Sequence, residues 1–273
     1  MKRQIAPYKT GIDCGNAYWM ARLSKEVYQS QDDSGKPDEG KILSALQGDD
    51  PKFKSITGAN KSSAQAMLAE HEEYLCMAFR GTDEIMDWID NINGLPEDAL
   101  FGKFHRGFWN SVGDVWDIIN GTYRKLNAER KRPLFITGHS LGGAMAVIAT
   151  SRFVAADQPF ISVYTFGQPR CMTRETARIF NSEAGSRCFR FQNNEDLVTR
   201  VPARLMGYSH VGRCHYIDAD RAIHTDPGFW FKFVDMVEGA VETLTTEKGF
   251  EGIKDHDIDD YLKAIEEWNL VND

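Results

Sequence analysis

The feature that most constrains the fold is the stretch from Pro133 to Ala156, in which two apolar segments flank a single serine. The run Pro133–Thr137 is apolar and partly β-branched, which is typical of a buried parallel strand. The segment Gly142–Ala156 is apolar nearly all round, which predicts a helix buried against a sheet. Between them lies the pattern Gly-x-Ser-x-Gly, centred on Ser140. The stretch therefore predicts a strand, a sharp turn and a helix.

This pattern suits a serine that acts as a nucleophile. A strained turn presents the serine hydroxyl above the sheet, and small residues on both sides let strand and helix approach closely. The start of the helix after Ser140 offers free N–H groups and the positive end of a dipole to a developing oxyanion. The alternative interpretation is an ordinary glycine-rich turn. The nucleophile interpretation therefore requires a base and an acid elsewhere in the chain.

Apolar runs that alternate with amphipathic segments predict an α/β protein, with a mostly parallel sheet covered by helices on both faces. The runs lie at residues 64–69, 74–79, 133–137, 161–166, 187–192 and 215–218. We expect the first two to form an antiparallel hairpin at an edge of the sheet, and the last to be the final strand. Residues 30–62 predict loops around one short helix. Helices are predicted at 17–29, 107–128, 173–181, 229–244 and before Trp268.

Length, charge and cysteine content narrow the class of protein. The 273 residues suffice for one domain, which we expect to span residues 1–273. The net charge of −8 argues against a nucleic-acid partner. No stretch reaches the length of a transmembrane helix. His-x-x-x-His and Cys-x-x-Cys spacings are absent, so we expect no metal and no cofactor.

The cysteines and the N-terminus bear on localisation. Five cysteines are an odd number without metal-type spacing, and the first residues hold no apolar run of the signal-peptide kind. We therefore expect a reduced, cytoplasmic protein, or one exported without a classical signal peptide.

A serine hydroxyl needs a base, and the base needs an orienting acid. Where the nucleophile sits in such a turn, the chain order is Ser, then Asp or Glu, then His. Asp196 follows the strand predicted at 187–192, and His256 lies just before the last helix. We therefore expect a catalytic triad of Ser140, Asp196 and His256. Three other histidines follow Asp196 and remain rival bases: His210, His215 and His224.

Short segments between about residues 64 and 265 carry a family resemblance. They are Phe79-Arg80-Gly81-Thr82, Asp87-Trp88, His105-x-Gly107-Phe108, Gly138-His139-Ser140-Leu141-Gly142-Gly143, Thr165-Phe166-Gly167-Gln168-Pro169-Arg170, Asn194-x-Asp196-x-Val198 with Pro202, and Asp255-His256 with Tyr261. In this order they resemble the class 3 lipases, which include fungal secreted lipases, feruloyl esterases and plant phospholipases A1.

The resemblance implies an α/β-hydrolase fold with a short helical lid. It implies a serine carboxylic-ester hydrolase that acts on lipid or other ester substrates, with triacylglycerol lipase as the first expectation. Phospholipase A1 and feruloyl-type esterase are alternatives on the same scaffold. An alternative of another class is a catalytically inactive lipid-binding or scaffold protein that keeps the fold.

The resemblance also assigns further roles. Thr82 and Leu141 would form the oxyanion hole. A lid at about 83–95 would cover Ser140 in water and open at a lipid–water interface, which would give interfacial activation. Its apolar side would consist of Ile85, Met86, Trp88, Ile89 and Ile92; the alternative is an ordinary surface helix packed on the core. The chain departs from the family at Asn91, where an acidic residue is usual, with Asp90 one position earlier.

Overall fold

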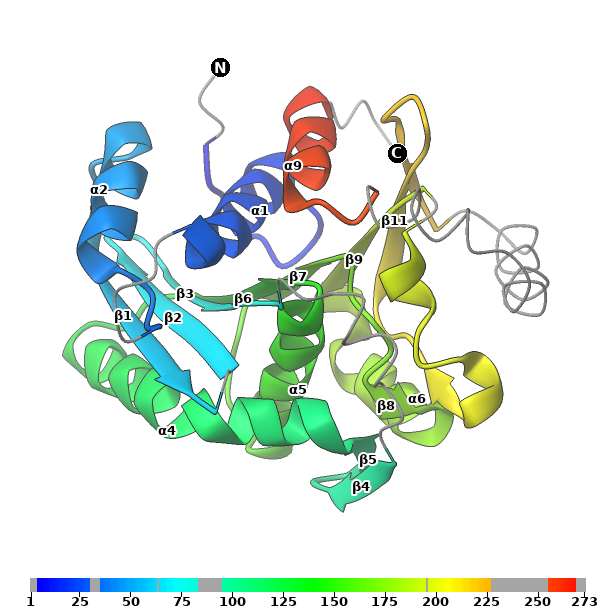
Figure 1. The fold of residues 1–273 in the computed structure, drawn as a ribbon. Helices are drawn as coiled ribbons and strands as arrows, with labels where there is room; N and C mark the ends of the chain where they lie inside the picture. The colour runs from blue at the N-terminus through cyan, green and yellow to red at the C-terminus, as the bar shows by residue number, and fades with distance from the viewer. Residues whose placement is uncertain are drawn as a thin grey trace.

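A computed structural model of the protein describes residues 4–29, 35–62, 64–82, 95–194, 196–226 and 255–268. They form one sheet of eight strands with helices on both faces, and a second sheet of four short strands (Figure 1). The large sheet contains, in spatial order, β1 (Phe53–Lys61), β2 (Ala64–His71), β3 (Leu75–Phe79), β6 (Leu134–His139), β7 (Ser162–Phe166), β9 (Cys188–Asn193), β11 (Arg213–Ile217) and β12 (Ile223–Thr225). The small sheet contains β10 (Tyr208–Ser209), β8 (Met172–Thr173), β5 (Gly102–His105) and β4 (Pro96–Ala99).

The five adjacent strands β3, β6, β7, β9 and β11 run parallel to one another. Every residue of β6, β7 and β9 is buried, as expected for strands covered on both faces. Because parallel strands end at the same edge, the loops that follow β3, β6, β7 and β9 meet there, which is where open α/β sheets bind ligands. The predicted α/β-hydrolase architecture is confirmed.

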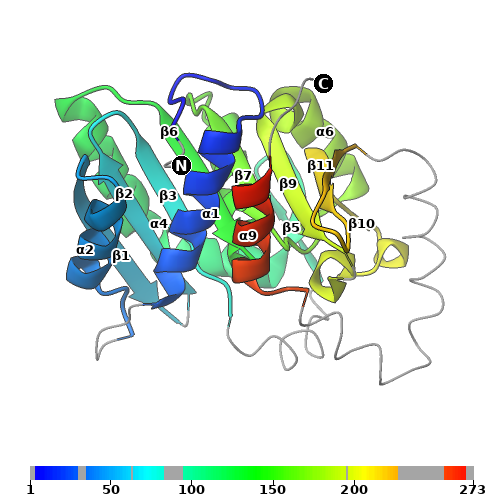
Figure 2. The ribbon, with the colours of Figure 1, turned by 90° about the horizontal axis from the view of Figure 1, so that it is seen from above.

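Helices cover both faces of the large sheet (Figures 1 and 2). On one face α1 (Cys14–Gln29) lies across β6, α9 (Ile258–Glu267) lies beside α1 and packs on β9, and α2 (Glu39–Asp49) packs against β1. The other face carries α4 (Arg106–Glu129), α5 (Leu141–Ala155) and α6 (Arg174–Ala184). Each face has its own apolar core, one centred on α5 and the other on α1 and α9. The apolar helix predicted after Ser140 is thus α5, buried between the sheet and α4.

Three short 3₁₀ helices complete the described structure: η1 (Gly185–Arg187), η2 (Leu197–Arg200) and η3 (Arg204–Met206). Of the described helices, none is both long and apolar enough to cross the bilayer.

The structure corrects the prediction at both edges of the sheet. Residues 53–61, expected as loop, form β1, so the hairpin of β2 and β3 is not at the edge. This strand mixes lysine, serine, glycine and asparagine and so lacks the apolar alternation of a strand. At the other edge β11 is not the final strand, because β12 returns antiparallel to it. The small sheet was also not predicted, since strands of two to four residues are too short for a periodic pattern.

Two predicted segments lie outside the described residues. One is the helix at 229–244. The other is the lid predicted at about 83–95, of which residues 83–94, with all of its predicted apolar positions and with Asp90 and Asn91, lie outside the described ranges.

Candidate active site

Ser140 stands in the sharp turn between β6 and α5. Its backbone has φ +58° and ψ −132°, a conformation that residues with a side chain rarely adopt. Its N–H donates to the carbonyl of Phe166 on β7 at 2.9 Å, and its carbonyl accepts from the N–H of Gly143 at 2.9 Å. The turn is therefore fastened both to the neighbouring strand and to the helix that it starts.

The two glycines of the motif are required by close packing. A Cβ atom on Gly138 would lie 2.2 Å from the carbonyl oxygen of Gly142. A Cβ atom on Gly142 would lie 2.0 Å from the carbonyl oxygen of Phe79 on β3. Real Cβ atoms do not approach backbone oxygens so closely, so any side chain at either position would push α5 off the sheet. The spacing Gly-x-Ser-x-Gly thus follows from the geometry of the turn.

Asp196 follows β9, and its carboxylate is wholly buried. Oδ2 accepts from Nδ1–H of His256 at 2.8 Å and from the hydroxyl of Tyr261 at 2.6 Å. Oδ1 accepts from the N–H of Val198 at 2.9 Å. Three donors compensate for the burial of this charge and fix its orientation. The proton on Nδ1 leaves the lone pair of His256 on Nε2, the atom a general base needs.

Tyr261, on α9, links Asp196 to the end of β9. Its hydroxyl also accepts from the backbone N–H of Asn193 at 2.9 Å. Burial, and then the charge of Asp196, raise the pKa of the Tyr261 phenol well above its usual value. The phenol therefore stays protonated and donates to the carboxylate.

His139, next to Ser140, touches the loop that carries His256. Its Nε2 lies 2.7 Å from the backbone oxygen of His256, and the two ring centroids are 4.5 Å apart. Since a carbonyl oxygen only accepts, Nε2 carries the proton, and Nδ1 accepts from the hydroxyl of Tyr28 at 2.9 Å. Burial, and then the neighbouring His256, hold the pKa of His139 well below its usual value, which keeps the ring neutral. A chain of hydrogen bonds thus runs from α1 to the His256 loop.

The loop of His256 has further attachments. The side-chain amide of Asn193 donates to the carbonyl of Asp255 at 2.8 Å, and that of Asn194 donates to the Asp255 carboxylate at 3.2 Å. Asp257 caps α9 by accepting from the N–H of Asp259. The carboxylates around His256 therefore serve the loop and the start of the helix.

The structure brings Ser140, Asp196 and His256 together at the carboxyl edge of β6, β7 and β9. All three side chains are fully buried. Within the described part of the chain, Ser140 Oγ and His256 Nε2 are buried polar atoms without a hydrogen-bond partner. Unsatisfied buried polar atoms are rare in folded proteins, and catalytic groups are one reason for them.

Gly81 and Thr82 follow β3 at the same edge. A Cβ atom on Gly81 would lie 2.8 Å from Cβ of Ser140, so this backbone touches the serine. Leu141 is the first residue of α5, and its N–H therefore has no intrahelical acceptor. Gly81 and Leu141 thus adjoin Ser140, and Thr82, the other residue predicted for the oxyanion hole, directly follows Gly81 in the chain.

The rival histidines have other surroundings. His210 is half-buried and donates from Nε2 to the carbonyl of Thr199 at 2.7 Å; desolvation, and then Arg190, hold its pKa well below the usual value. His215 lies on β11, stacked on Phe191. His224 is exposed and pairs with Asp218 at 2.6 Å. Of the three, none is hydrogen-bonded to Asp196 in the described structure. No group of three or more His, Cys, Asp or Glu residues suited to a metal ion occurs in the described ranges.

Sequence reasoning missed Tyr28 and treated His139 as a packed histidine. Nothing in the sequence links them, because 111 positions separate the two residues. The apolar pattern of α1 predicts only which side of the helix is buried and not which residues its polar groups contact.

The α/β-hydrolase fold and this edge of the sheet define a class, the serine ester hydrolases. The profile of the lipase (class 3) family matches residues 76–206. The secreted mono- and diacylglycerol lipase A of Penicillium cyclopium is 25% identical over 218 residues, which cover 73% of this chain and 68% of that protein. Both comparisons support a relationship to the class 3 lipases.

Two more comparisons bear on the function. Phospholipase A1-II 1 of Oryza sativa subsp. indica is 26% identical over 212 residues, or 67% of this chain and 53% of that enzyme. Among solved structures, a triacylglycerol lipase whose catalytic centre is described as a serine protease triad superposes with a TM-score of 0.66 at 22% identity. The superposition covers 77% of this chain and 82% of that one, which shows the shared fold.

The prediction of localisation is wrong. Fungal relatives are named as secreted lipases, which points to export instead of a cytoplasmic protein. The error came from taking free cysteines as a mark of a reducing compartment. The thiols of Cys76, Cys171 and Cys188 are buried, and burial raises their pKa, that of Cys188 to about 12. Buried protonated thiols are inert in either compartment, so they carry no information about it.

Proposed function

We propose that the chain is a triacylglycerol lipase, hydrolysing acylglycerol esters with Ser140 as nucleophile, His256 as base and Asp196 as orienting acid. The observation that carries the proposal is the 2.8 Å hydrogen bond between His256 Nδ1 and Asp196 Oδ2, fully buried beside the Ser140 turn. The lipid class is supported by relatives that are named lipases.

The reaction follows the logic of an acyl-enzyme. Ser140 Oγ attacks the ester carbonyl carbon while its proton passes to Nε2 of His256. Asp196 stabilises the imidazolium through Nδ1–H. The tetrahedral intermediate collapses, the C–O bond to the alcohol breaks, and the alcohol leaves with the proton from Nε2. Water then attacks the acyl-enzyme by the same proton route, which releases the carboxylic acid and restores Ser140.

The negative charge of the intermediate needs donors that are already in place. The N–H of Leu141 at the start of α5 and the backbone N–H of Thr82 are the proposed pair. Loss of one such donor typically lowers kcat by about 10²–10³.

The test is hydrolysis of p-nitrophenyl esters from C2 to C16 by the wild type, by Ser140→Ala and by Ser111→Ala. Ser111 is a half-buried serine on α4 and serves as the matched control. We expect turnover of long-chain esters by the wild type and the control and none by Ser140→Ala, with a serine-directed phosphonate labelling Ser140. Equal turnover by Ser140→Ala, or label on another residue, would overturn the proposal.

Phospholipase A1 activity is the second candidate, favoured by the similarity to the rice enzyme. Release of the sn-1 acyl chain from phosphatidylcholine, measured beside release from triolein, ranks the two. A preference for the phospholipid would assign the chain to that activity with the same three residues. Turnover limited to C2–C4 esters would instead indicate an esterase of the feruloyl type.

We also propose that residues 1–273 form one domain and that the segment at about 83–95 is a lid. The basis is the helical spacing of its apolar residues and its place after Thr82. A jump in rate as a short-chain ester passes its solubility limit is the expected result. A smooth saturation curve would reject the lid.

A further inference from the structure

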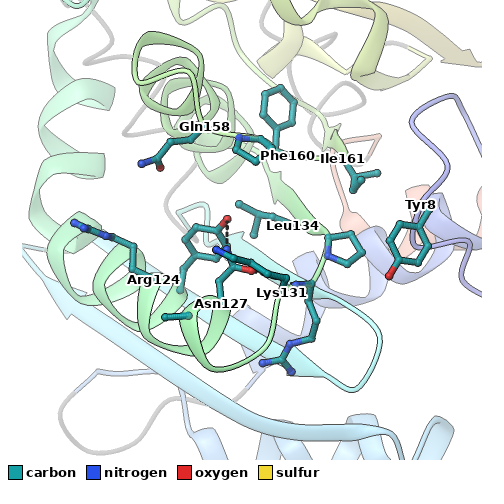
Figure 3. A pocket seen from close by; sticks show the side chains of 13 residues that line it. Tyr8, Arg124, Asn127, Lys131, Leu134, Gln158, Phe160 and Ile161 are labelled. Atoms are coloured by element: carbon teal, nitrogen blue, oxygen red, sulfur yellow. Dashed lines mark hydrogen bonds between the residues drawn. The ribbon is translucent and has the colours of Figure 1, made fainter.

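A cavity of about 700 Å³ opens at the edge of the sheet opposite Ser140. It lies where the end of α4, the start of β6 and the segment after α5 meet, with Tyr8 of the N-terminal segment at one side (Figure 3). Leu134 in its lining begins β6, whereas Ser140 follows the end of that strand. A six-residue strand spans roughly 20 Å, so the cavity is separate from the catalytic edge. Its volume is that of a small-molecule site.

The floor of the cavity is apolar and firmly held. Leu134 and Phe160 are buried, with exposed fractions of 2% and 4%. The N–H of Ile161 donates to the carbonyl of Leu134 at 2.8 Å. The guanidinium of Arg187 lies 4.1 Å from the centre of the Phe160 ring and donates to the carbonyl of that residue at 2.9 Å. The walls are therefore in place before any ligand arrives.

The charge of the lining has one sign. Arg124, Lys131 and Arg132 line the cavity, and no lining residue is acidic, although the chain as a whole carries a net charge of −8. Arg132 is already neutralised by Glu70 at 2.9 Å. The side chains of Arg124 and Lys131 form no hydrogen bond or ion pair within the described ranges. In Figure 3 both lie across Leu134 from Phe160, at the helix side of the cavity.

Arg124 and Lys131, two cations without an ion-pair partner in the described part of the chain, lie beside an apolar floor, and this combination indicates which kind of ligand the cavity can bind. Nucleotides and other polyanions are often bound by backbone N–H groups at the start of a helix, whereas this lining contains the C-terminal end of α4 and two residues without an N–H, Pro133 and Pro159. A neutral lipid would leave the two cations unused. An amphiphile with one negative charge satisfies both parts, since its chain covers the floor and its head group pairs with Arg124 and Lys131.

We propose that this cavity binds a single-chain amphiphile with one anionic head group, such as a medium-chain fatty acid carboxylate. The site needs neither Ser140 nor ester hydrolysis. It is thus independent of the proposed function.

The test is calorimetric binding of dodecanoate, below its micellar concentration, to the folded protein. Arg124→Glu/Lys131→Glu reverses the charge of the lining, and Lys125→Glu/Arg130→Glu makes the same change at exposed positions beside it. We expect the first pair to weaken binding at least tenfold and the second to leave it within twofold. Equal weakening by both pairs would show a diffuse charge effect and would overturn the proposal. The proposal would also be overturned if binding to anionic vesicles weakened equally in both pairs of variants.

A second variant places the ligand in this cavity and not at the catalytic edge. Ala128 lines the cavity from the exposed side of α4, so Ala128→Phe fills it without disturbing the core. We expect this variant to lose at least tenfold in affinity and Ser140→Ala to lose none. The opposite pattern would move the ligand to the catalytic edge. Dodecanol should bind at least tenfold more weakly and acetate not measurably; equal binding of dodecanol would remove the role of the cations. Esterase activity is read separately, so its absence would leave this result intact.

Discussion

Ser140 and His256 lie at the same edge of the sheet but are held there in different ways. Ser140 is placed mainly by its immediate neighbours, the glycines at 138 and 142 and the first turn of α5. His256 is placed by residues from distant parts of the chain. Asp196 holds its ring, His139 holds its carbonyl, and the chain reaches α1 through Tyr28.

The two residues of this one site therefore depend on different features of the chain, a local sequence pattern for Ser140 and long-range hydrogen bonds for His256. A nucleophile in a sharp turn needs small residues at fixed positions on both sides, so its sequence pattern is short even though the strands that it contacts are distant in sequence. A base in a surface loop has no such pattern, and its position depends on hydrogen bonds that form only once the sheet and α9 are assembled. Changes near Ser140 should therefore act on folding, and changes around His256 should act on catalysis.

The largest effect is expected from Asp196→Asn. An amide in place of the carboxylate no longer stabilises the His256 imidazolium and favours the wrong tautomer, which lowers kcat by about 10⁴. Asp218→Asn is the matched control, because Asp218 forms the exposed pair with His224. Ester hydrolysis by both variants is the measurement. A loss in Asp218→Asn and none in Asp196→Asn would transfer the role of base to His224.

Gly142→Ala tests the local packing that positions Ser140. The new methyl group would meet the Phe79 carbonyl, and overpacking of this kind lowers the free energy of unfolding by about 1–3 kcal/mol. Gly121→Ala on α4 is the control, since no atom lies within 4 Å of its Cβ position and alanine favours a helix by about 1 kcal/mol. Urea unfolding gives both values. Equal stability of Gly142→Ala and the wild type would mean that α5 shifts freely, against the packing seen here.

The sequence predicted the parts of the molecule that depend on near neighbours. The turn of Ser140, the parallel centre of the sheet and the order Ser, Asp, His all came from patterns of a few residues. It did not predict β1, which is polar because it lies at the edge, or the link from Tyr28 to His139, which joins α1 to β6. The cavity beside Leu134 was missed for the same reason. It is enclosed by separate segments of the chain, and no local pattern in the sequence brings these segments together.

Tyr28→Phe tests the long-range hydrogen bonds that position His256, and we expect a smaller effect. Without the hydroxyl, Nδ1 of His139 loses its donor, and the His139 ring that bonds to the His256 carbonyl is held less firmly. A buried group left unpaired costs about 1–3 kcal/mol. We expect kcat to fall by about tenfold, with KM unchanged.

Tyr18→Phe is the control for this prediction. It makes the same chemical change on the same helix, at a half-buried position. A rise in KM with kcat unchanged in Tyr28→Phe would show that Tyr28 acts on substrate binding instead of on the position of His256.

The smallest expected effect is on the free energy of unfolding at acidic pH. The folded pKa of His139 is held below the unfolded value of about 6.5, so below that pH the unfolded chain binds a proton that folded His139 does not. The free energy of unfolding therefore falls as the pH drops below about 6.5, by at most about 1.4 kcal/mol per pH unit for one group. His139→Gln, which keeps a donor and an acceptor, should reduce this slope by up to one proton. Urea unfolding between pH 6.5 and 5 measures it.

His210→Gln is the parallel variant, because desolvation also lowers the pKa of His210, but this residue lies off the chain of hydrogen bonds to His256. It should reduce the slope by a similar amount, and the double variant by the sum. An unchanged slope in His139→Gln alone would mean that the folded ring carries a proton. Tyr28 would then accept from Nδ1 instead of donating to it, and His256 would lie beside a positive charge. That charge would disfavour the imidazolium on which catalysis depends, so the direction of one hydrogen bond from α1 decides whether His139 assists the base or opposes it.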